Sequence, residues 1–397
     1  MYPSINIPPS EFAARRARLA EHLAAQNLTG VVLFDNYYIL YYSAFAFIPT
    51  ERPMAFVMTA EGQAGLFVPR LELEHAKSKS GIERVDSYVE YPDNPHPMQR
   101  LRHMLADMGI GGRIGADSDG YPWIFGYRGP SLSELTGAAV TPVAAFVEDS
   151  LMIKSPAEIA LIRESVTWGH LAHVLLQRYT RVGATETEVS LRVSTEATLA
   201  MMDAIGPLYA AQSTYGSGAS AGYRGQIGRN AAIPHALANN IAFQAGDVLV
   251  TGAGAPVWGY NSELERTMFV GQPSDQQRRM FDHMKAVQEV AFAALRPGAL
   301  CSDVDRAVRA YYEQHDLMPY WKHHSGHAIG LRYHEAPFLD TGDDTVLKPG
   351  MLFTVEPGLY AAGLGGFRHS DTVLMTEDGL EMLTYYPRDL ESLTIPV

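Results

Sequence analysis

Two glutamates stand two positions apart in the segment TGAGAPVWGYNSELERT, residues 251–267. The segment reads as a strand, a turn and a second strand, and in an extended chain the side chains at i and i+2 point to the same face. We therefore expect Glu263 and Glu265 to share a face, although neighbouring like charges repel one another. Such a pair can face water, a metal ion or a cationic substrate.

Other polar residues interrupt apolar strand patterns in the second half of the chain. Glu356 is the most informative of them, because a carboxylate between Val355 and Pro357 in a core strand is unfavourable unless it is paired or ligated. The remaining stretches are IPHALAN at 233–239, SELERT at 262–267, HHSGHAIGLRYHEAP at 323–337 and GGFRHSDTVLM at 365–375. Together they suggest one polar cavity, in which burial and like charges adjust pKa values for catalysis.

The composition narrows the class of protein. With 397 residues, of which 47% are hydrophobic, the chain can form two domains with sizeable cores. A net charge of −13 without a basic stripe argues against nucleic acid as a partner. The single cysteine, Cys301, excludes an intrachain disulfide and is typical of a reducing compartment. No secretion signal or membrane-spanning run is visible, so the sequence predicts a cytoplasmic protein.

The elements that must position the polar residues follow from local patterns. The first 150 residues predict alternating helices and strands, which indicates a small α/β domain over 1–150. The expected elements are a helix at 10–27 with Ser10 as its N-cap, a strand at 30–35, a hairpin at 52–69 that turns at Glu61 and Gly62, a helix near 97–109 and a strand at 112–117.

The second domain, residues 151–397, begins at a capping box. Ser155, Pro156 and Glu158 supply the N-cap, N1 and N3 residues of a long helix. Further helices are predicted at 185–204, 274–295 and 302–315, with strands at 247–255, 262–270, 350–357 and 367–376. This pattern predicts an α+β domain with a mostly antiparallel sheet.

The order and residue types of these segments resemble those of the creatinase/prolidase/methionine-aminopeptidase family, peptidase family M24. The stretch MIKSPAEIALIRES at 152–165 resembles its interdomain junction, and residues 1–150 resemble its creatinase-type N-terminal domain. The resemblance implies an α/β N-terminal domain followed by an α+β pita-bread catalytic domain. It also implies a homodimer, with the active site near the subunit interface.

The metallopeptidases of this family bind two metal ions through two aspartates, a histidine and two glutamates. The corresponding residues here are Gly252, Glu263, His327, Glu356 and Ser370. Glycine has no side-chain donor and a neutral serine is a poor replacement for a carboxylate, so a dinuclear site is not expected. His369 and Asp371 flank Ser370, but strand alternation should aim both away from its face.

The same positions resemble creatinase, the metal-free hydrolase of the family, more closely. Its histidine and two substrate-binding glutamates correspond to His235, Glu265 and Glu356, and its carboxylate-binding arginine corresponds to Arg52 of ERP. The remaining pocket positions of this chain depart from creatinase. Glu263 stands in place of an alanine, Thr50 and Asn261 in place of aromatic residues, and His334 in place of a second arginine, matching the catalytic HE histidine of the peptidases.

The hypothesis that follows is metal-independent, creatinase-like hydrolysis of a C–N bond in a small amidine, guanidine or amide. His235 would act as general base and acid, and Glu265 and Glu356 would bind the N–H groups of the substrate. The residues expected to surround the substrate are Arg52, Tyr260, Glu263, His327 and His334. No cofactor is expected in this hypothesis.

Two alternatives stay open. The first is an Xaa-Pro aminopeptidase or dipeptidase that uses a single divalent metal on Glu263, His327 and Glu356, since three protein ligands can form a catalytic site. The second is a pita-bread protein that has lost catalysis and binds a ligand only. The retained histidines argue against this second alternative.

Overall fold

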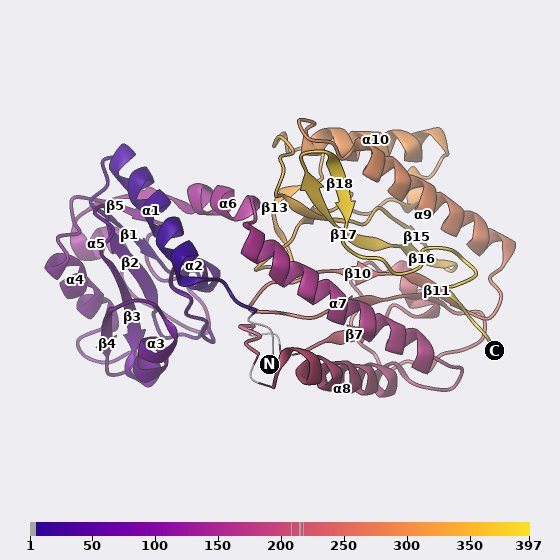
Figure 1. The fold of residues 1–397 in the computed structure, drawn as a ribbon, viewed down its shortest axis with the longest axis horizontal. Helices are drawn as coiled ribbons and strands as arrows, with labels where there is room; N and C mark the ends of the chain where they lie inside the picture. Colours follow the sequence, from indigo (N-terminus) through magenta and orange to yellow (C-terminus); the bar gives the residue numbers. More distant parts are fainter. Residues whose placement is uncertain (1–4, 208, 214–215, 217) are drawn as a thin grey trace. The chain divides into compact units, whose positions relative to one another are not determined.

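The computed structural model describes residues 5–207, 209–213, 216 and 218–397. Its residues divide into two compact units, and the division falls between Ser150 and Leu151, inside helix α6 (Ala144–Met152). Figure 1 shows the two units. None of the helices in the described ranges is long and apolar enough to cross a membrane.

The N-terminal unit is built on a mixed sheet of six strands in the order β4-β3-β2-β1-β5-β6. The strands are β1 (Gly30–Leu33), β2 (Ala55–Thr59), β3 (Ala64–Pro69), β4 (Arg84–Tyr88), β5 (Arg113–Ala116) and β6 (Ala139–Pro142). Strand β1 pairs antiparallel with β2 and parallel with β5. The predicted hairpin is confirmed as β2 and β3, which pair antiparallel. Strands β1 and β2 are entirely buried, as their apolar sequences require.

Helices surround this sheet. They are α1 (Pro9–Ala25), α2 (Asn36–Ser43), α3 (Leu73–Lys79), α4 (Pro97–Asp107) and α5 (Leu132–Thr136), with a 3₁₀ turn η1 (Arg70–Glu72). The prediction of Ser10 as the N-cap of the first helix is wrong. The helix begins at Pro9, and its N-cap residue, Pro8, makes no side-chain cap. Proline suits the first helical position because its φ is already near the helical value and it has no N–H to leave unbonded.

The C-terminal unit contains two pairs of packed helices. They are α7 (Pro156–Tyr179), α8 (Glu186–Ile205), α9 (Asp275–Ala294) and α10 (Cys301–Gln314), with 3₁₀ turns η2 (Gly228–Ala232) and η3 (Met318–Tyr320). The capping box at the start of α7 is confirmed, since Ser155 and Glu158 each bond the backbone N–H of the other. Helix α7 packs on α8 and on strand β9, and α9 packs on α10 and on β14.

The main sheet of this unit has eight strands and is antiparallel throughout. Its strands are β13 (Glu335–Phe338), β12 (His327–Ala328), β14 (Leu352–Val355), β17 (Ser370–Thr376), β10 (Leu264–Glu265), β9 (Gly252–Gly254) and β7 (Ser220–Gly222) in spatial order, with β18 (Gly379–Met382) paired to β17. A second sheet holds β19 (Thr394–Ile395), β11 (Thr267–Val270) and β8 (Val248–Val250), and β15 (Gly358–Ala361) pairs with β16 (Gly365–Arg368).

The strands predicted at 247–255 and 262–270 are each interrupted once. Thr251 separates β8 from β9, and Arg266 separates β10 from β11, so each chain segment leaves one sheet and enters another. The two interrupting residues bond one another: Thr251 N–H donates to the Arg266 carbonyl at 3.0 Å, and Arg266 N–H donates to Thr251 Oγ1 at 2.9 Å. The break therefore leaves no backbone donor unsatisfied at these two residues.

Arg266 is fully buried at this break and holds three segments together. Its Nη2 lies 2.7 Å from Asp371 Oδ1, and both side chains are 0% exposed. The guanidinium also donates to the carbonyl oxygens of Ser370, Tyr386 and Pro387. Because both charges are paired and hydrogen-bonded, the pair is tolerated inside the core, but removal of one partner would leave a bare buried charge.

We expect Asp371→Asn to lower the free energy of unfolding of the C-terminal unit by about 3–5 kcal/mol. The substitution keeps the shape of the side chain but leaves the Arg266 charge unpaired, and urea unfolding followed by circular dichroism measures the effect. Glu381→Gln is the matched control, because Glu381 and Arg163 form a pair that is 41% and 46% exposed. The control should change the free energy of unfolding by no more than about 1 kcal/mol. Equal effects of the two substitutions would contradict a stabilising role for the buried Arg266–Asp371 pair.

Candidate metal centre

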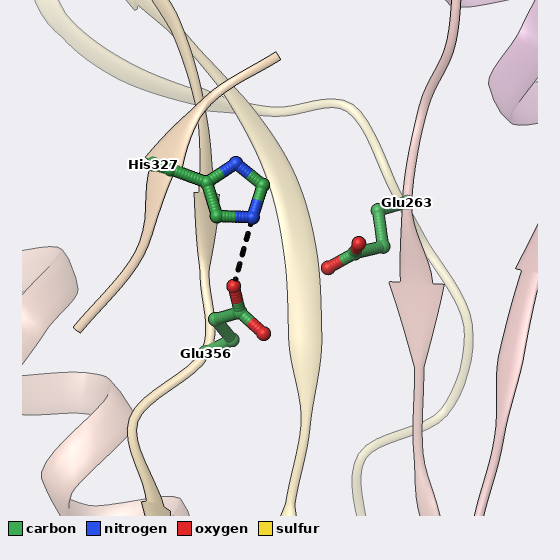
Figure 2. Close-up of side chains that lie close together, drawn as sticks. All are labelled: Glu263, His327 and Glu356. Atoms are coloured by element: carbon green, nitrogen blue, oxygen red, sulfur yellow. Dashed lines mark ion pairs between the residues drawn. The ribbon is translucent and has the colours of Figure 1, made fainter. Parts of the chain in front are cut away.

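Glu263, His327 and Glu356 converge at one point of the main sheet. Glu263 directly precedes β10, His327 begins β12 and Glu356 directly follows β14. Each residue offers one ligand atom, and these atoms all lie within 4.8 Å of one another. Figure 2 shows both carboxylates turned toward the Nε2 edge of the imidazole. No other group of three histidine, cysteine or acidic residues in the described ranges meets this arrangement.

The ring of His327 is oriented for a ligand at Nε2. Its Nδ1 lies 3.0 Å from the carbonyl oxygen of Ala328, which can only accept, so Nδ1 carries a hydrogen. Nε2 lies 3.1 Å from Glu356 Oε1 and, among the described residues, has no partner with hydrogen-bond geometry. An imidazole fixed through Nδ1 beside two carboxylates fits a divalent ion such as Zn²⁺ or Mn²⁺.

The three side chains lie close enough to shift one another's pKa values. Burial raises the pKa of Glu263, and the charges of Glu356 and Glu265 add to this effect and bring it to about 8. Burial disfavours the charged form of His327, but contact with Glu356 and the charges of Glu356 and Glu263 outweigh it and raise its pKa to about 9. Burial likewise opposes ionisation of Glu356, yet His327 and Arg368 hold its pKa well below the usual value.

The positions that would complete a second metal site hold no donor carboxylate. Gly252 faces Glu265, whose Oε1 lies 3.6 Å from where a Cβ on the glycine would stand. Ser370 donates a hydrogen bond from Oγ to Glu263 Oε1 at 2.7 Å. Ser370 therefore orients one ligand of the centre, and only three ligands remain for an ion.

Glu265 lies beside the centre but is already paired with arginines. Arg368 binds it through Nε and Nη2, the latter at 2.8 Å from Oε1, and Arg224 Nη2 lies 3.0 Å from the same oxygen. Arg368 also donates to Tyr360 Oη at 2.8 Å, and its Nε lies 3.8 Å from Glu356 Oε2. Arg368 is therefore the buried cation next to the three ligands.

Besides His327, two histidines that the sequence predicted for the site lie in this region. The rings of His334 and His327 stack with centroids 3.8 Å apart, and burial together with the charge of His327 lowers the pKa of His334 to about 4. His235 is exposed on a turn after η2, close enough to His334 for their charges to interact. Arg368 Nη1 donates to the carbonyl of the preceding Pro234 at 3.5 Å and so ties this turn to the centre.

Other predicted site residues have contacts outside the three-residue group. Tyr260 is buried and its hydroxyl donates to Glu158 Oε1 at 2.5 Å. Asn261 donates from Nδ2 to the carbonyl oxygens of Gly259, Gly330 and Leu331. Within the N-terminal unit, Arg52 is paired with Glu51 and Glu90, and its backbone N–H donates to Thr50 Oγ1.

His369 and Asp371 point away from the centre, as strand alternation predicts. Asp371 binds Arg266, and the His369 ring packs edge-on against Phe281 of α9. Both ring nitrogens of His369 are buried, and within the part of the chain that the structure describes neither has a hydrogen-bond partner.

The comparisons with known proteins agree with this geometry. Residues 160–377 match the model of metallopeptidase family M24, and residues 15–150 match the creatinase/prolidase N-terminal domain. The chain therefore belongs to the metallopeptidase family M24, and its fold is the two-domain, pita-bread architecture that the sequence predicted.

Individual relatives match this chain over most of its length. The probable dipeptidase PepE of Mycobacterium tuberculosis is 29% identical over 392 residues, 98% of each chain, and the Xaa-Pro dipeptidase of Pyrococcus furiosus is 29% identical over 335 residues, 84% of this chain and 88% of its own. Among solved structures, dipeptidase PepE from Mycobacterium ulcerans superposes with a TM-score of 0.82 at 25% identity, covering 99% of this chain and 100% of its own. The prolidase from Pyrococcus horikoshii has a TM-score of 0.78 at 27% identity, covering 95% and 99%.

These findings correct the leading hypothesis from the sequence. The hypothesis of metal-independent, creatinase-like hydrolysis by His235, Glu265 and Glu356 is wrong. The expectation that the protein needs no cofactor is wrong as well. The family is one of metallopeptidases, its relatives are named as dipeptidases, and a Glu–His–Glu group fit for a metal is present. The broader expectation of a hydrolase that acts on C–N bonds is supported, since peptidases form this class.

Two residues of this region were not predicted as site residues from the sequence. Arg368 lies in the polar stretch 365–375, and its place two positions before Ser370 indicates that both share a face. Arg224 gave no local signal, because its contact with Glu265 spans 41 residues and depends on how two strands pair.

We expect the metal-free protein to bind one equivalent of Mn²⁺ or Zn²⁺ per chain, because only three ligands converge. His327→Ala should weaken this binding by more than about 100-fold, measured by calorimetry and by metal analysis after dialysis. His103→Ala, which removes an exposed histidine of α4, is the control and should bind normally. Two tightly bound equivalents, or unchanged binding by the His327 variant, would contradict a mononuclear centre.

His369→Leu should raise the free energy of unfolding by roughly 1 kcal/mol, because a buried imidazole without partners is replaced by an apolar side chain. Thermal and urea unfolding measure the change. His103→Leu, at an exposed position, should stay within about 0.5 kcal/mol of the parent protein. A loss of more than about 1 kcal/mol in the His369 variant would show that its ring nitrogens are satisfied after all.

Proposed function

We propose that the protein is a metal-dependent peptidase that cleaves Xaa-Pro or related short peptides with a single divalent ion. The observation that carries this proposal is the convergence of Glu263, His327 and Glu356, with the His327 ring fixed through Nδ1. Membership of a metallopeptidase family supports it, as do the relatives named as dipeptidases and Xaa-Pro dipeptidases.

The three converging residues would hold the ion. When bound, a divalent ion supplies Lewis acidity, which polarises the scissile carbonyl and acidifies water. Ser370 supports this role of Glu263 by its hydrogen bond to Oε1, and Thr354 supports that of Glu356 by a hydrogen bond of 3.3 Å to Oε1. Such supporting contacts fix the orientation of ligands before binding.

Glu356 and two histidines would handle the proton and the substrate. Besides its role as a ligand, Glu356 would accept a proton from the attacking water at Oε2, since its Oε1 faces His327. His334, held parallel to His327 by stacking, donates a hydrogen bond to the carbonyl oxygen of the peptide. His235 on its exposed turn contacts the substrate at the open side of the centre.

We also propose, from the family resemblance, that the protein is a homodimer in which Arg52 acts near the subunit interface. The low cysteine content supports a cytoplasmic location. Analytical ultracentrifugation tests the first of these two proposals, and localisation of the tagged protein tests the second.

The central test is hydrolysis of a panel of Xaa-Pro and Xaa-Ala dipeptides by protein stripped of metal and then reloaded. We expect no turnover without metal and full turnover after addition of Mn²⁺, Co²⁺ or Zn²⁺. Glu356→Gln also alters a metal ligand, so it is assayed at saturating metal; kcat should still fall by about 10²–10⁴, because the proton acceptor is lost. Glu381→Gln, which alters only an exposed ion pair, is the matched control and should keep normal activity.

Two results would contradict the proposal. Equal turnover before and after chelation would exclude a metal-dependent reaction. Tight binding of one metal ion without hydrolysis of any peptide in the panel would favour a protein that binds a ligand without catalysis.

A further inference from the structure

Arg224 connects the buried acid Glu265 with solvent. Its Nη2 lies 3.0 Å from Glu265 Oε1, yet the Arg224 side chain is 52% exposed and that of Glu265 only 4%. Arg224 follows β7 with a positive φ of 50°, a conformation that non-glycine residues seldom adopt. Strand β7 is an edge strand of the main sheet, so Arg224 lies just beyond the end of that edge strand.

The absence of a side chain at residue 252 makes this contact possible. Gly252 pairs with Gly222 across β9 and β7, so neither strand places a side chain between Arg224 and Glu265. A Cβ on Gly252 would already stand 3.6 Å from Glu265 Oε1. A longer side chain there would compete with the guanidinium for the same carboxylate.

Glu265 alone cannot satisfy Arg224. Arg368 already binds both oxygens of that carboxylate, so a single negative charge is shared between two guanidinium groups. Arg224 uses only Nη2, toward Glu265 and Gln226 Oε1, and within the described part of the chain its Nε and Nη1 have no hydrogen-bond partner. A half-exposed arginine with unused donors can bind a further carboxylate, since its planar fork matches that group.

The position of Arg224 relative to the metal centre determines which carboxylate this can be. Glu265 lies two residues from Glu263 and opposite Ser370, whose hydroxyl bonds Glu263, so Arg224 and the centre share one face of the sheet. In a dipeptide the C-terminal carboxylate is separated from the scissile bond by a single residue.

Resting on the proposed function, we propose that Arg224 binds the free C-terminal carboxylate of the substrate and restricts the enzyme to dipeptides. A longer peptide substrate has an amide at this position instead of a carboxylate. The amide carries no charge to pair with a guanidinium. The arginine therefore decides the length of the substrate, while the three metal ligands, Glu356 among them, carry out the reaction.

The test compares Arg224→Gln with the parent protein on an Xaa-Pro dipeptide and on its C-terminal amide. We expect the parent to prefer the free acid, and the variant to show a KM for the free acid about 10- to 100-fold higher with kcat little changed. The amide should be affected little. Arg229→Gln, at an exposed arginine of η2 five residues further along the chain, is the matched control and should behave as the parent on both substrates.

Equilibrium binding provides a readout that does not need turnover. In metal-free protein, which should not turn the peptide over, the free dipeptide should bind more tightly than its amide, and Arg224→Gln should remove that difference. Equal loss of affinity for both forms, or no loss for either, would overturn the role of Arg224. Failure of the proposed function is distinguishable, because the parent protein would then hydrolyse neither form at any metal concentration.

Discussion

Three carboxylates crowd into one region of the C-terminal unit, and the positive charge placed around them determines how the centre is built. Burial and the neighbouring charges of Glu265 and Glu356 raise the pKa of Glu263 to about 8, which shows how unfavourable three ionised acids would be without compensation. Arg368 compensates one of them through two hydrogen bonds, and His327 pairs with another. A divalent ion would supply the charge that is still lacking.

The same constraint applies at the two positions where the family's peptidases carry further ligands. Where the peptidases of the family have an aspartate, Gly252 leaves space next to Glu265, and Arg224 reaches that carboxylate. Where they have a glutamate, Ser370 keeps a hydrogen bond to Glu263. The protein has exchanged metal-binding carboxylates for an arginine–glutamate–arginine arrangement, and the remaining three donors still converge.

Much of the fold could be predicted from the sequence, because the relevant signals are local. The capping box at Ser155 and Glu158 defines the start of α7, and the two-residue period places Glu263 and Glu265 on one face. The interruptions at Thr251 and Arg266 could not be predicted, since they arise where strands change partners between sheets. Local patterns contain no information about such pairings.

The sequence brings Glu263, His327 and Glu356 forward through the family resemblance. The two missing ligands argue against a dinuclear site and favour a metal-free hypothesis, with a single ion on these three residues as the alternative. Whether three donors can still hold an ion depends on where their atoms meet, and in the structure they meet within 4.8 Å. The contact between Arg368 and Glu265 spans 103 residues, so only the folded chain reveals it.

The buried guanidinium of Arg266 affects the order in which the two units can fold during synthesis. It is held by the carbonyl oxygens of Tyr386 and Pro387, and the adjoining strand β11 is completed by β19 at Thr394–Ile395. A growing polypeptide lacks these partners until residues 386–395 have emerged. The N-terminal unit can fold before that point, whereas the C-terminal unit cannot complete its core until then.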